Sequence, residues 1–254
     1  MQTNGLRRRL ELGQPSFGIG LLWPSPELAE LSGYVGFDWL WLDLEHGPFD
    51  LDSLTNVVRA AEVAGMETIV RLSQTRDPEA ILRYLETGVT GIVLPHVRSR
   101  ADVEFAVSAV KYPPLGVRSA GQFRPARWAA GGPNPAFYAS ENHRTVVVAL
   151  VEDEQGLANI DAILDVDGLD AVVIGFGDLA LTMGHPADKG HPDVLRVGRA
   201  AQDKIIASTK ALQVTVQDGD EAKTWIDRGA LMVRCSLQSV LIPGLRTWLE
   251  RASA

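Results

Sequence analysis

Short apolar runs alternate with longer amphipathic segments along almost the whole chain. Most of the runs are continuously apolar, such as TVVVALVE and AVVIG, which is typical of parallel strands that are buried on both faces. The longer segments carry their apolar residues at helical spacing. The pattern predicts strands at residues 18–22, 39–43, 68–71, 91–95, 145–152, 171–175, 214–217 and 232–235.

The amphipathic segments between these strands predict helices. The clearest of them are residues 51–64, 78–87, 101–111, 157–164 and 193–212. Several connections reach a glycine just before the next strand, at the point where a helix commonly ends on a residue in the left-handed conformation. These glycines are Gly65, Gly88, Gly168 and Gly229.

Eight strand–helix units in a chain of 254 residues predict a single (β/α)8 TIM barrel that spans residues 1–254. An open doubly wound sheet is the alternative. The chain has no GxGxxG or P-loop motif at a strand–helix junction, which disfavours the nucleotide-binding form of that sheet. The longest irregular stretch, residues 113–142, contains glycines, prolines and arginines, and we expect it to be functional.

Composition and charge exclude several classes of partner. Hydrophobic residues make up 46% of the chain, enough for a large core, and the formal net charge of −8 argues against nucleic-acid binding. No apolar run approaches the roughly 18–20 residues of a membrane span, and no apolar segment of a secretory signal follows the first residues. We therefore expect a cytoplasmic protein that acts on small molecules. The single cysteine, Cys235, excludes an intrachain disulfide.

Charged residues cluster where several predicted strands end. In a TIM barrel the carboxyl ends of the strands form the active site, and ionisable groups buried there without partners would be costly. A shared site therefore explains these residues better than chance. They are Asp43, Glu45 and His46 after the second strand, Arg71 on the third, Glu152 and Asp153 on the fifth, and Asp178 after the sixth.

Glu152 and Asp178 end adjacent strands, and their all-oxygen donors favour a hard cation such as Mg2+ or Mn2+. The alternative is that each carboxylate caps a helix or pairs with an arginine. Asp178 and Gly177 also open a predicted helix, whose backbone N–H groups can bind a carboxylate. One substrate could then bind the metal through its acid and keto oxygens.

Arg71 and His46 are candidates for the acid–base and charge chemistry. A buried guanidinium at the end of an apolar strand can stabilise an enolate oxygen, although a simple ion pair is equally compatible with the sequence. His46 lies three residues after Asp43, which suits a general base that a carboxylate orients. The alternative is an ordinary loop histidine.

Other polar residues have less specific patterns. His185 and His191 could form a metal pair, but the prolines around them favour a surface loop. Arg118 and Arg127 could recognise a substrate anion or could be plain surface charges. His96, after the fourth strand, could support the site or simply pack.

Taken together, the motifs resemble the class II, metal-dependent pyruvate aldolases of the 4-hydroxy-2-oxoheptanedioate and 2-dehydro-3-deoxyglucarate aldolase family. The resemblance extends from about Gly18 to Leu241. Ordered motifs at matching separations are far more specific than any one of them. They are GFDWLWLDLEHGPFD at 36–50, VRLSQTRDP at 70–78, GVTGIVLPHV at 88–97, KYPPLGVRS at 111–119, the stretch 150–186, and GHPDV at 190–194.

The resemblance implies a barrel of the phosphoenolpyruvate/pyruvate-domain type and a divalent metal, Mg2+ or Mn2+ with Co2+ as a further candidate, without an organic cofactor. It implies a lyase that adds a pyruvate enolate to an aldehyde and assembles as a hexamer, a trimer of dimers. The roles fall on residues as follows: Glu152 and Asp178 as metal ligands, His46 as base with Asp43 as its acidic partner, Arg71 on the enolate, the N–H groups of Gly177 and Asp178 on the pyruvate carboxylate, and Glu86 near a neighbour's site.

The chain departs from the family pattern around this set of residues. Leu150 replaces a glutamine that usually stands two positions before the metal glutamate, Phe176 alters the usual turn before Asp178, and Leu44 replaces a smaller residue. These departures affect the expected acceptor preference and efficiency more than the enolising residues.

Two rival functions remain at the level of sequence: a carbon–carbon lyase that acts on a CoA ester, of the citryl- or malyl-CoA type, and a non-catalytic barrel that binds a metal and an anion. A Schiff-base aldolase is disfavoured because every lysine lies in a polar or helix-like segment. These lysines are Lys111, Lys189, Lys204, Lys210 and Lys223.

Overall fold

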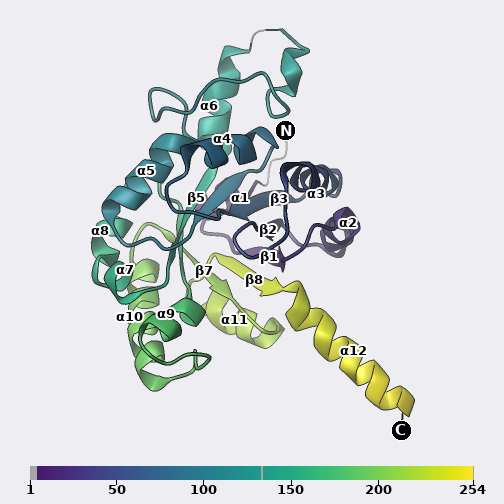
Figure 1. Ribbon diagram of the computed structural model, residues 1–254, viewed down its shortest axis with the longest axis vertical. Helices are drawn as coiled ribbons and strands as arrows, with labels where there is room; N and C mark the ends of the chain where they lie inside the picture. Colours follow the sequence, from purple (N-terminus) through teal and green to yellow (C-terminus); the bar gives the residue numbers. More distant parts are fainter. Residues whose placement is uncertain (1–4, 133, 254) are drawn as a thin grey trace.

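The computed structural model describes residues 5–132 and 134–253, so the outermost residues of the predicted domain, together with residue 133, lie outside the described part. Eight parallel strands pair in sequence order and close into a barrel, and this confirms the predicted (β/α)8 TIM barrel (Figure 1). The strands are β1 (Ser16–Leu21), β2 (Trp39–Asp43), β3 (Glu67–Arg71), β4 (Gly91–Leu94), β5 (Val146–Val151), β6 (Ala171–Ile174), β7 (Ala211–Thr215) and β8 (Met232–Ser236).

Helices surround the barrel and connect its strands. They are α1 (Leu6–Glu11), α2 (Pro26–Val35), α3 (Leu51–Val63), α4 (Pro78–Glu86), α5 (Arg100–Val110), the 3-10 turn η1 (Arg127–Ala129), α6 (Pro135–Arg144), α7 (Glu154–Ala158), α8 (Ile160–Leu164), α9 (Phe176–Thr182), α10 (Pro192–Ala207), α11 (Gly219–Asp227) and α12 (Leu237–Ser253). The four glycines that were expected to end helices have positive φ angles between 79° and 108°. Gly65, Gly88 and Gly229 directly follow the capping residue of a helix, whereas α8 ends at Leu164 and Gly168 lies in the turn before β6.

The continuous apolar runs occur because successive strand residues face two different cores. In β2, Leu40 and Leu42 pack outward against the helices, whereas Trp39 and Trp41 fill the barrel interior. Both sets are fully or almost fully buried. An alternating pattern of polar and apolar residues, which a half-exposed strand would show, is therefore absent from this strand.

Two glycines of strand β1 leave room in the barrel interior for side chains of the neighbouring strands. A Cβ atom on Gly18 would lie 2.5 Å from the indole of Trp39, and one on Gly20 would lie 2.6 Å from Nη1 of Arg234. Both distances are shorter than van der Waals contact. The two glycines therefore allow a tryptophan and an arginine to extend across the barrel from strands β2 and β8.

The predicted bounds were wrong for one strand, for the helix before it and for the irregular stretch. Strand β7 begins at Ala211, three residues before the predicted start, because α10 ends at Ala207. There the Ser208 hydroxyl donates to the Ile205 carbonyl and accepts from the Lys210 N–H, so the chain leaves the helix early. The stretch 113–142 was expected to be irregular, but its last part begins helix α6, which has Pro135 in its first turn.

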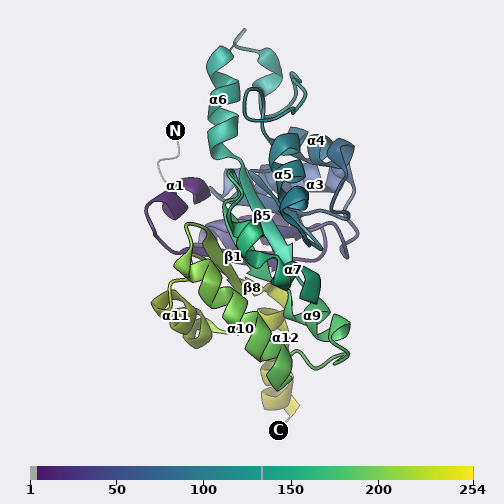
Figure 2. The ribbon, with the colours of Figure 1, turned by 90° about the vertical axis from the view of Figure 1, so that its left-hand side faces the viewer.

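Helices α6 and α12 extend away from the barrel at opposite ends of its long axis (Figures 1 and 2). In α12 only Leu237 is buried. None of the helices in the described ranges combines the length and the apolar character that a membrane crossing requires. The large apolar side chains that α12 leaves exposed are Val240, Leu241, Ile242, Leu245, Trp248 and Leu249.

Candidate active site

The last residues of the neighbouring strands β2 and β3 form an ion pair. Asp43 and Arg71 lie opposite each other in the strand register. Arg71 Nε donates a 3.0 Å hydrogen bond to Asp43 Oδ1, and its Nη2 donates to Oδ2. Burial raises the pKa of Asp43, but the hydrogen bonds and the charge of Arg71 outweigh burial, and the net pKa lies below its ordinary value. The pair therefore stays charged at neutral pH.

Asp43 also fixes the loop that follows β2. Its Oδ1 accepts hydrogen bonds from the backbone N–H groups of Glu45 at 3.1 Å and His46 at 3.2 Å. The sequence predicted that Asp43 orients the His46 imidazole. The contacts that the structure describes join Asp43 to the main chain of His46, and His46 is exposed in the turn that follows β2.

Glu45 and His96 extend the ion pair across the mouth to strand β5. Arg71 Nη1 lies 3.0 Å from Glu45 Oε2, and Glu45 Oε1 lies 2.9 Å from His96 Nε2. His96 Nδ1 lies 2.9 Å from Glu152 Oε1, which also accepts the backbone N–H of His96 at 2.8 Å. His96 has a φ of 51°, which non-glycine residues rarely adopt. A continuous series of contacts thus joins Asp43 to Glu152.

Glu152 is almost completely buried, with 3% of its surface exposed. Burial raises its pKa to about 7; the contacts with His96 oppose this shift, and the negative charges of Asp178 and Glu45 add to it. A cation would relieve such a cluster of carboxylates, and their oxygen atoms are the donors that a hard divalent ion prefers. Glu152 and Asp178 therefore fit the predicted metal site in both charge and donor type.

Asp178 lies in the first turn of α9, directly after strand β6. The chain reaches this position through Gly175, where a Cβ atom would lie 2.7 Å from Glu152 Oε2. Glycine at this position therefore lets the turn approach the buried carboxylate. Gly177, which was predicted to offer its N–H group to a substrate, is exposed in the same turn.

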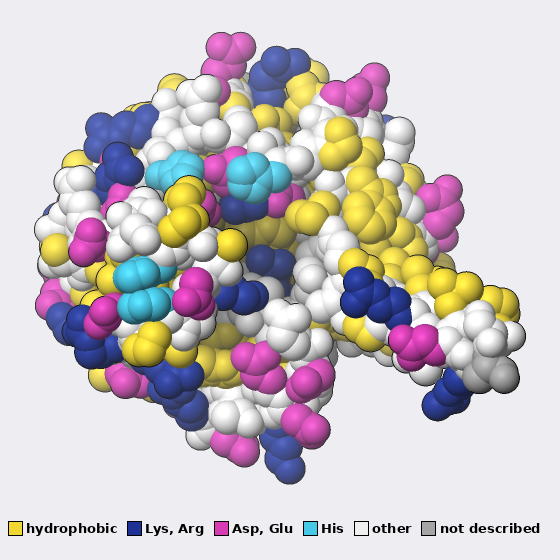
Figure 3. Space-filling view, turned by 60° about the horizontal axis from the view of Figure 1, so that its bottom comes forward, with side chains coloured by type: hydrophobic (Ala, Val, Ile, Leu, Met, Phe, Trp, Pro, Cys, Tyr) yellow, Lys and Arg dark blue, Asp and Glu magenta, His cyan; other side chains and the backbone are white. Residues whose placement is uncertain are grey.

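Arg71, Glu152, Gly175, Gly177 and Asp178 line a cavity of about 570 Å3 at the strand ends. Figure 3 shows this face of the molecule, with basic and acidic side chains around a hollow. The cavity continues from Arg71 and Glu152 to strands β7 and β8, where Gln213 and Arg234 line it. The arrangement can bind an anion beside a metal and can hold a proton acceptor at the rim.

Arg234 and Gln213 were not among the residues predicted for the site. Arg234 interrupts the apolar strand MVRCS in the same way that Arg71 ends ETIVR, so the signal was present in the sequence. Its guanidinium lies 4.3 Å from the centroid of the Trp41 ring. Burial, together with the charge of Arg71, lowers the pKa of Arg234 to about 10.

His185 and His191 lie on the surface loop that was predicted for them, between α9 and α10. Their rings stack with centroids 3.5 Å apart. With Asp193 they form a group whose ligand atoms lie within 4.8 Å of one another, compact enough for a metal ion, outside the strand-end cavity. The two histidines therefore lie on a surface loop, as predicted, and are also close enough together to form a metal pair.

Glu86 is not part of the strand-end cavity of its own chain. It ends α4, at the opposite end of the barrel, where it accepts a hydrogen bond of 3.3 Å from Arg118. Arg118 is buried, with its guanidinium 4.5 Å from the ring centroid of Tyr112, and it is not the surface charge that the sequence left open.

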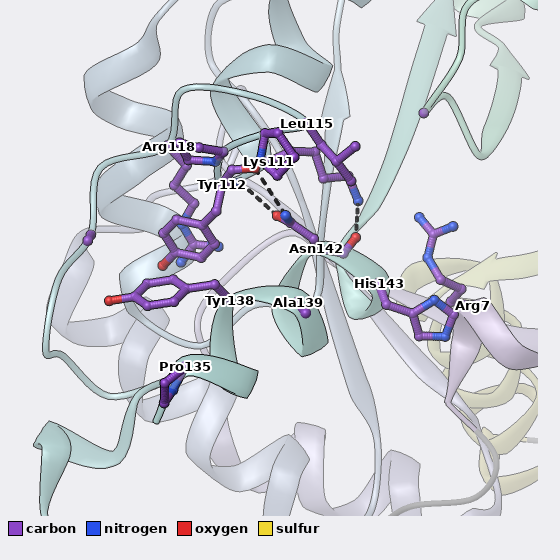
Figure 4. A pocket seen from close by; sticks show the side chains of 14 residues that line it. Arg7, Lys111, Tyr112, Leu115, Arg118, Pro135, Tyr138, Ala139, Asn142 and His143 are labelled. Carbon is purple, nitrogen blue, oxygen red and sulfur yellow. Dashed lines mark hydrogen bonds between the residues drawn. The ribbon is translucent and has the colours of Figure 1, made fainter. Parts of the chain in front are cut away.

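The Arg118 side chain borders a larger cavity of about 1030 Å3 between the loop that follows α5 and helix α6 (Figure 4). Lys111 directly follows α5, in the helix-like segment predicted for it, and borders this cavity with only 4% of its surface exposed. Its Nζ donates to the carbonyl oxygens of Asn142 at 2.7 Å and Thr145 at 2.6 Å. It therefore anchors the start of β5 and lies far from the strand-end site.

A closed parallel barrel with ionisable side chains at the carboxyl ends of its strands defines an enzyme of the α/β-barrel class. The chain belongs to the HpcH/HpaI aldolase/citrate lyase family, whose model matches residues 21–243.

Named relatives resemble almost the whole chain. It is 34% identical to a hydroxypyruvate/pyruvate aldolase of Pseudomonas aeruginosa, over 95% of this chain and 90% of that protein. It is 32% identical to a 4-hydroxy-2-oxo-heptane-1,7-dioate aldolase of Klebsiella pneumoniae, over 94% and 90% of the two chains. A crystal structure of a family member from Burkholderia cenocepacia superimposes with a TM-score of 0.90 at 28% identity, covering 99% and 100% of the chains.

Proposed function

We propose that the chain is a metal-dependent pyruvate aldolase, an aldehyde-lyase that joins the enolate of pyruvate to an aldehyde or cleaves the resulting 4-hydroxy-2-oxo acid. One observation carries the proposal: the series of contacts from Asp43 through Arg71, Glu45 and His96 to Glu152, at the strand ends of a family whose relatives are named as aldolases. Residues 1–254 act as a single domain.

Glu152 and Asp178 are the residues that would hold the divalent ion. The buried position of Glu152 and its raised pKa beside Asp178 support this role. Mg2+ and Mn2+ suit the oxygen donors, with Co2+ as a further candidate, and the reaction needs no organic cofactor. The chemistry that the ion supplies is that of a Lewis acid, which makes the methyl protons of pyruvate more acidic.

The protein supplies the proton transfer and the charge stabilisation. His46 removes a proton from the pyruvate methyl group, and the electron pair moves to the C2 oxygen, where the Arg71 guanidinium stabilises it. Asp43 holds Arg71 and the main chain of His46 in position. The N–H groups of Gly177 and Asp178 bind the carboxylate. The enolate carbon then attacks the aldehyde carbon, and the protonated His46 returns its proton to the resulting alkoxide oxygen, which completes the new hydroxyl group.

The proposal includes the assembly. The exposed apolar side chains of α12 support a homo-oligomer, which the family resemblance predicts to be a hexamer built as a trimer of dimers. In such a hexamer Glu86 acts at the site of a neighbouring subunit, since it lies far from the site of its own chain. The enzyme works in the cytoplasm.

Solvent exchange into pyruvate tests the donor half of the reaction without any aldehyde. In D2O the enzyme should replace the methyl protons of pyruvate by deuterium, which proton NMR follows as loss of the methyl signal. The exchange should require a divalent ion, and borohydride should not trap an intermediate, because no imine forms. His46→Ala should slow the exchange by roughly 10²–10⁴-fold, the usual contribution of a positioned general base.

Arg71→Ala should slow the exchange at least as much, because it removes a charge from a largely dry site. Arg71→Lys serves as the second variant, since it keeps a charge beside Asp43 and protects the fold. If metal-loaded wild-type protein shows no exchange above that of the metal alone, the aldolase proposal fails.

A further inference from the structure

The strand-end cavity contains polar groups that the proposed reaction does not use. Arg71 is paired with Asp43 and Glu45, but Arg234 forms no ion pair within the described ranges, and its Nε is buried without a hydrogen-bond partner. A buried guanidinium ordinarily lies against a carboxylate or another anion. Arg234 is therefore a buried cation for which the described part of the chain provides no carboxylate partner.

Gln213, on the neighbouring strand β7, is a second buried polar residue without a hydrogen-bond partner. Its surface is completely buried, yet neither its Oε1 nor its Nε2 has a hydrogen-bond partner in the described part of the chain. Buried amide groups are nearly always hydrogen-bonded, so an amide with both ends free points to a missing partner. Gln213 and Arg234 line the same cavity, on strands that pair directly with each other.

Residues of neighbouring strands hold the Arg234 guanidinium in position. Trp41 supports one face of it at 4.3 Å, and Gly20 leaves room for its Nη1, where any side chain would collide. Leu150 also lines this cavity, and its side chain offers no competing acceptor. The hydrogen-bonding edge of the guanidinium is therefore free for a ligand, and Arg71 nearby adds a second positive charge.

We propose that Arg234 and Gln213 form a subsite for a second carboxylate of the substrate, distinct from the carboxylate of the 2-oxo acid that binds at α9. The guanidinium suits a carboxylate because it can donate two parallel hydrogen bonds, and the Gln213 amide can donate a third. This inference rests on the proposed aldolase function. The second carboxylate belongs either to a dicarboxylic 2-oxo acid donor or to an aldehyde acceptor with a terminal acid.

Paired substrates with and without the extra carboxylate test the subsite. Arg234→Gln should lower kcat/KM for succinic semialdehyde about 10- to 100-fold relative to wild type, the usual effect of a lost charge-assisted hydrogen bond, and leave kcat/KM for butanal within about threefold. The same comparison between oxaloacetate and pyruvate as donors decides which substrate carries the group. Gln213→Leu, which keeps the volume, should show a smaller loss in the same direction.

Arg228→Gln is the matched control. Arg228 also stacks on a tryptophan at 4.3 Å, but it lies on the outer surface and is paired with Asp203. This variant should leave all four substrates unaffected. Equal losses for charged and uncharged substrates in Arg234→Gln would overturn the subsite.

A binding measurement separates this inference from the aldolase proposal. Malonate should change the tryptophan fluorescence of wild-type protein, because Trp41 lies against Arg234, and Arg234→Gln should weaken malonate binding at least tenfold while Arg228→Gln does not. If pyruvate exchange is absent but malonate binds in this way, the aldolase proposal fails and the anion subsite stands. If malonate binds equally to wild type and Arg234→Gln, the subsite is wrong.

Discussion

At the scale of the residue, the ionisable groups of this barrel derive their properties from the partners that burial gives them. Asp43 and Glu152 are both buried carboxylates, but the pKa of Asp43 is lowered and that of Glu152 is raised to about 7. The difference is that Asp43 has the guanidinium of Arg71 beside it, whereas Glu152 faces further acids and a histidine. A protein that keeps a carboxylate in the second setting gains from a cation there.

Removing either proposed metal ligand tests this interpretation. Glu152→Gln and Asp178→Asn should each abolish the stimulation of pyruvate exchange by Mg2+ or Mn2+ and weaken Mn2+ binding in calorimetry, because each removes an anionic oxygen donor. Glu154→Gln, an exposed acid two residues from Glu152, should behave as wild type. Full activity of both ligand variants after exhaustive chelation would remove the metal from the mechanism.

The ionisable residues of the site could be predicted from the sequence, but their contacts could not. Asp43, Arg71 and Glu152 stand out because charged residues are rare at the ends of apolar strands. The bond between Asp43 and Arg71 depends on strand register, and the bridge through His96 depends on an unusual backbone angle, neither of which a linear pattern reveals. Arg234 was overlooked although its signal was the same as that of Arg71.

At the scale of the element, the apolar pattern located the strands well, because both of their faces are buried. Boundaries were less certain: a single serine, Ser208, ended α10 and moved β7 by three residues. The connection between α5 and β5 could not be predicted either, because it depends on Lys111, a polar residue that is buried by bonds to distant carbonyl groups.

The burial of Lys111 makes stability depend on pH in a definite direction. Burial lowers its pKa from 10.5 to about 8, so between these values the unfolded chain binds more protons than the folded one, and the free energy of unfolding rises with pH. Between pH 7 and pH 9.5 the free energy of unfolding of the wild-type protein, measured in urea, should rise by about 2 kcal/mol relative to that of Lys111→Met.

The exposed lysine variant Lys223→Met controls for the loss of a surface charge and should show no comparable gain. The free energies of unfolding of wild type and Lys111→Met could instead differ by a constant amount over this pH range. That result would show that the folded protein keeps Lys111 protonated throughout.

At the scale of the whole molecule, most of α12 is exposed: only Leu237 of this helix is buried in the described part of the chain. Its exposed apolar side chains should be covered by further copies of the chain. Light scattering should therefore report a species well above the 27.5 kDa of one chain, with a hexamer expected. Leu245→Glu should shift the protein toward smaller species, whereas Thr247→Glu, on the same helix, should not. A wild-type monomer at micromolar concentration would contradict this prediction.

The two glycines of β1 limit which substitutions this protein can accept in evolution. Trp39 and Arg234 occupy the space that side chains at Gly18 and Gly20 would need, so these positions cannot change independently. A lineage that acquires a larger residue at Gly20 must first lose the long side chain of Arg234, and one that shortens Trp39 gains freedom at Gly18. Among descendants of this sequence, these two pairs should therefore covary, and a change in one member should open the way to a change in the other.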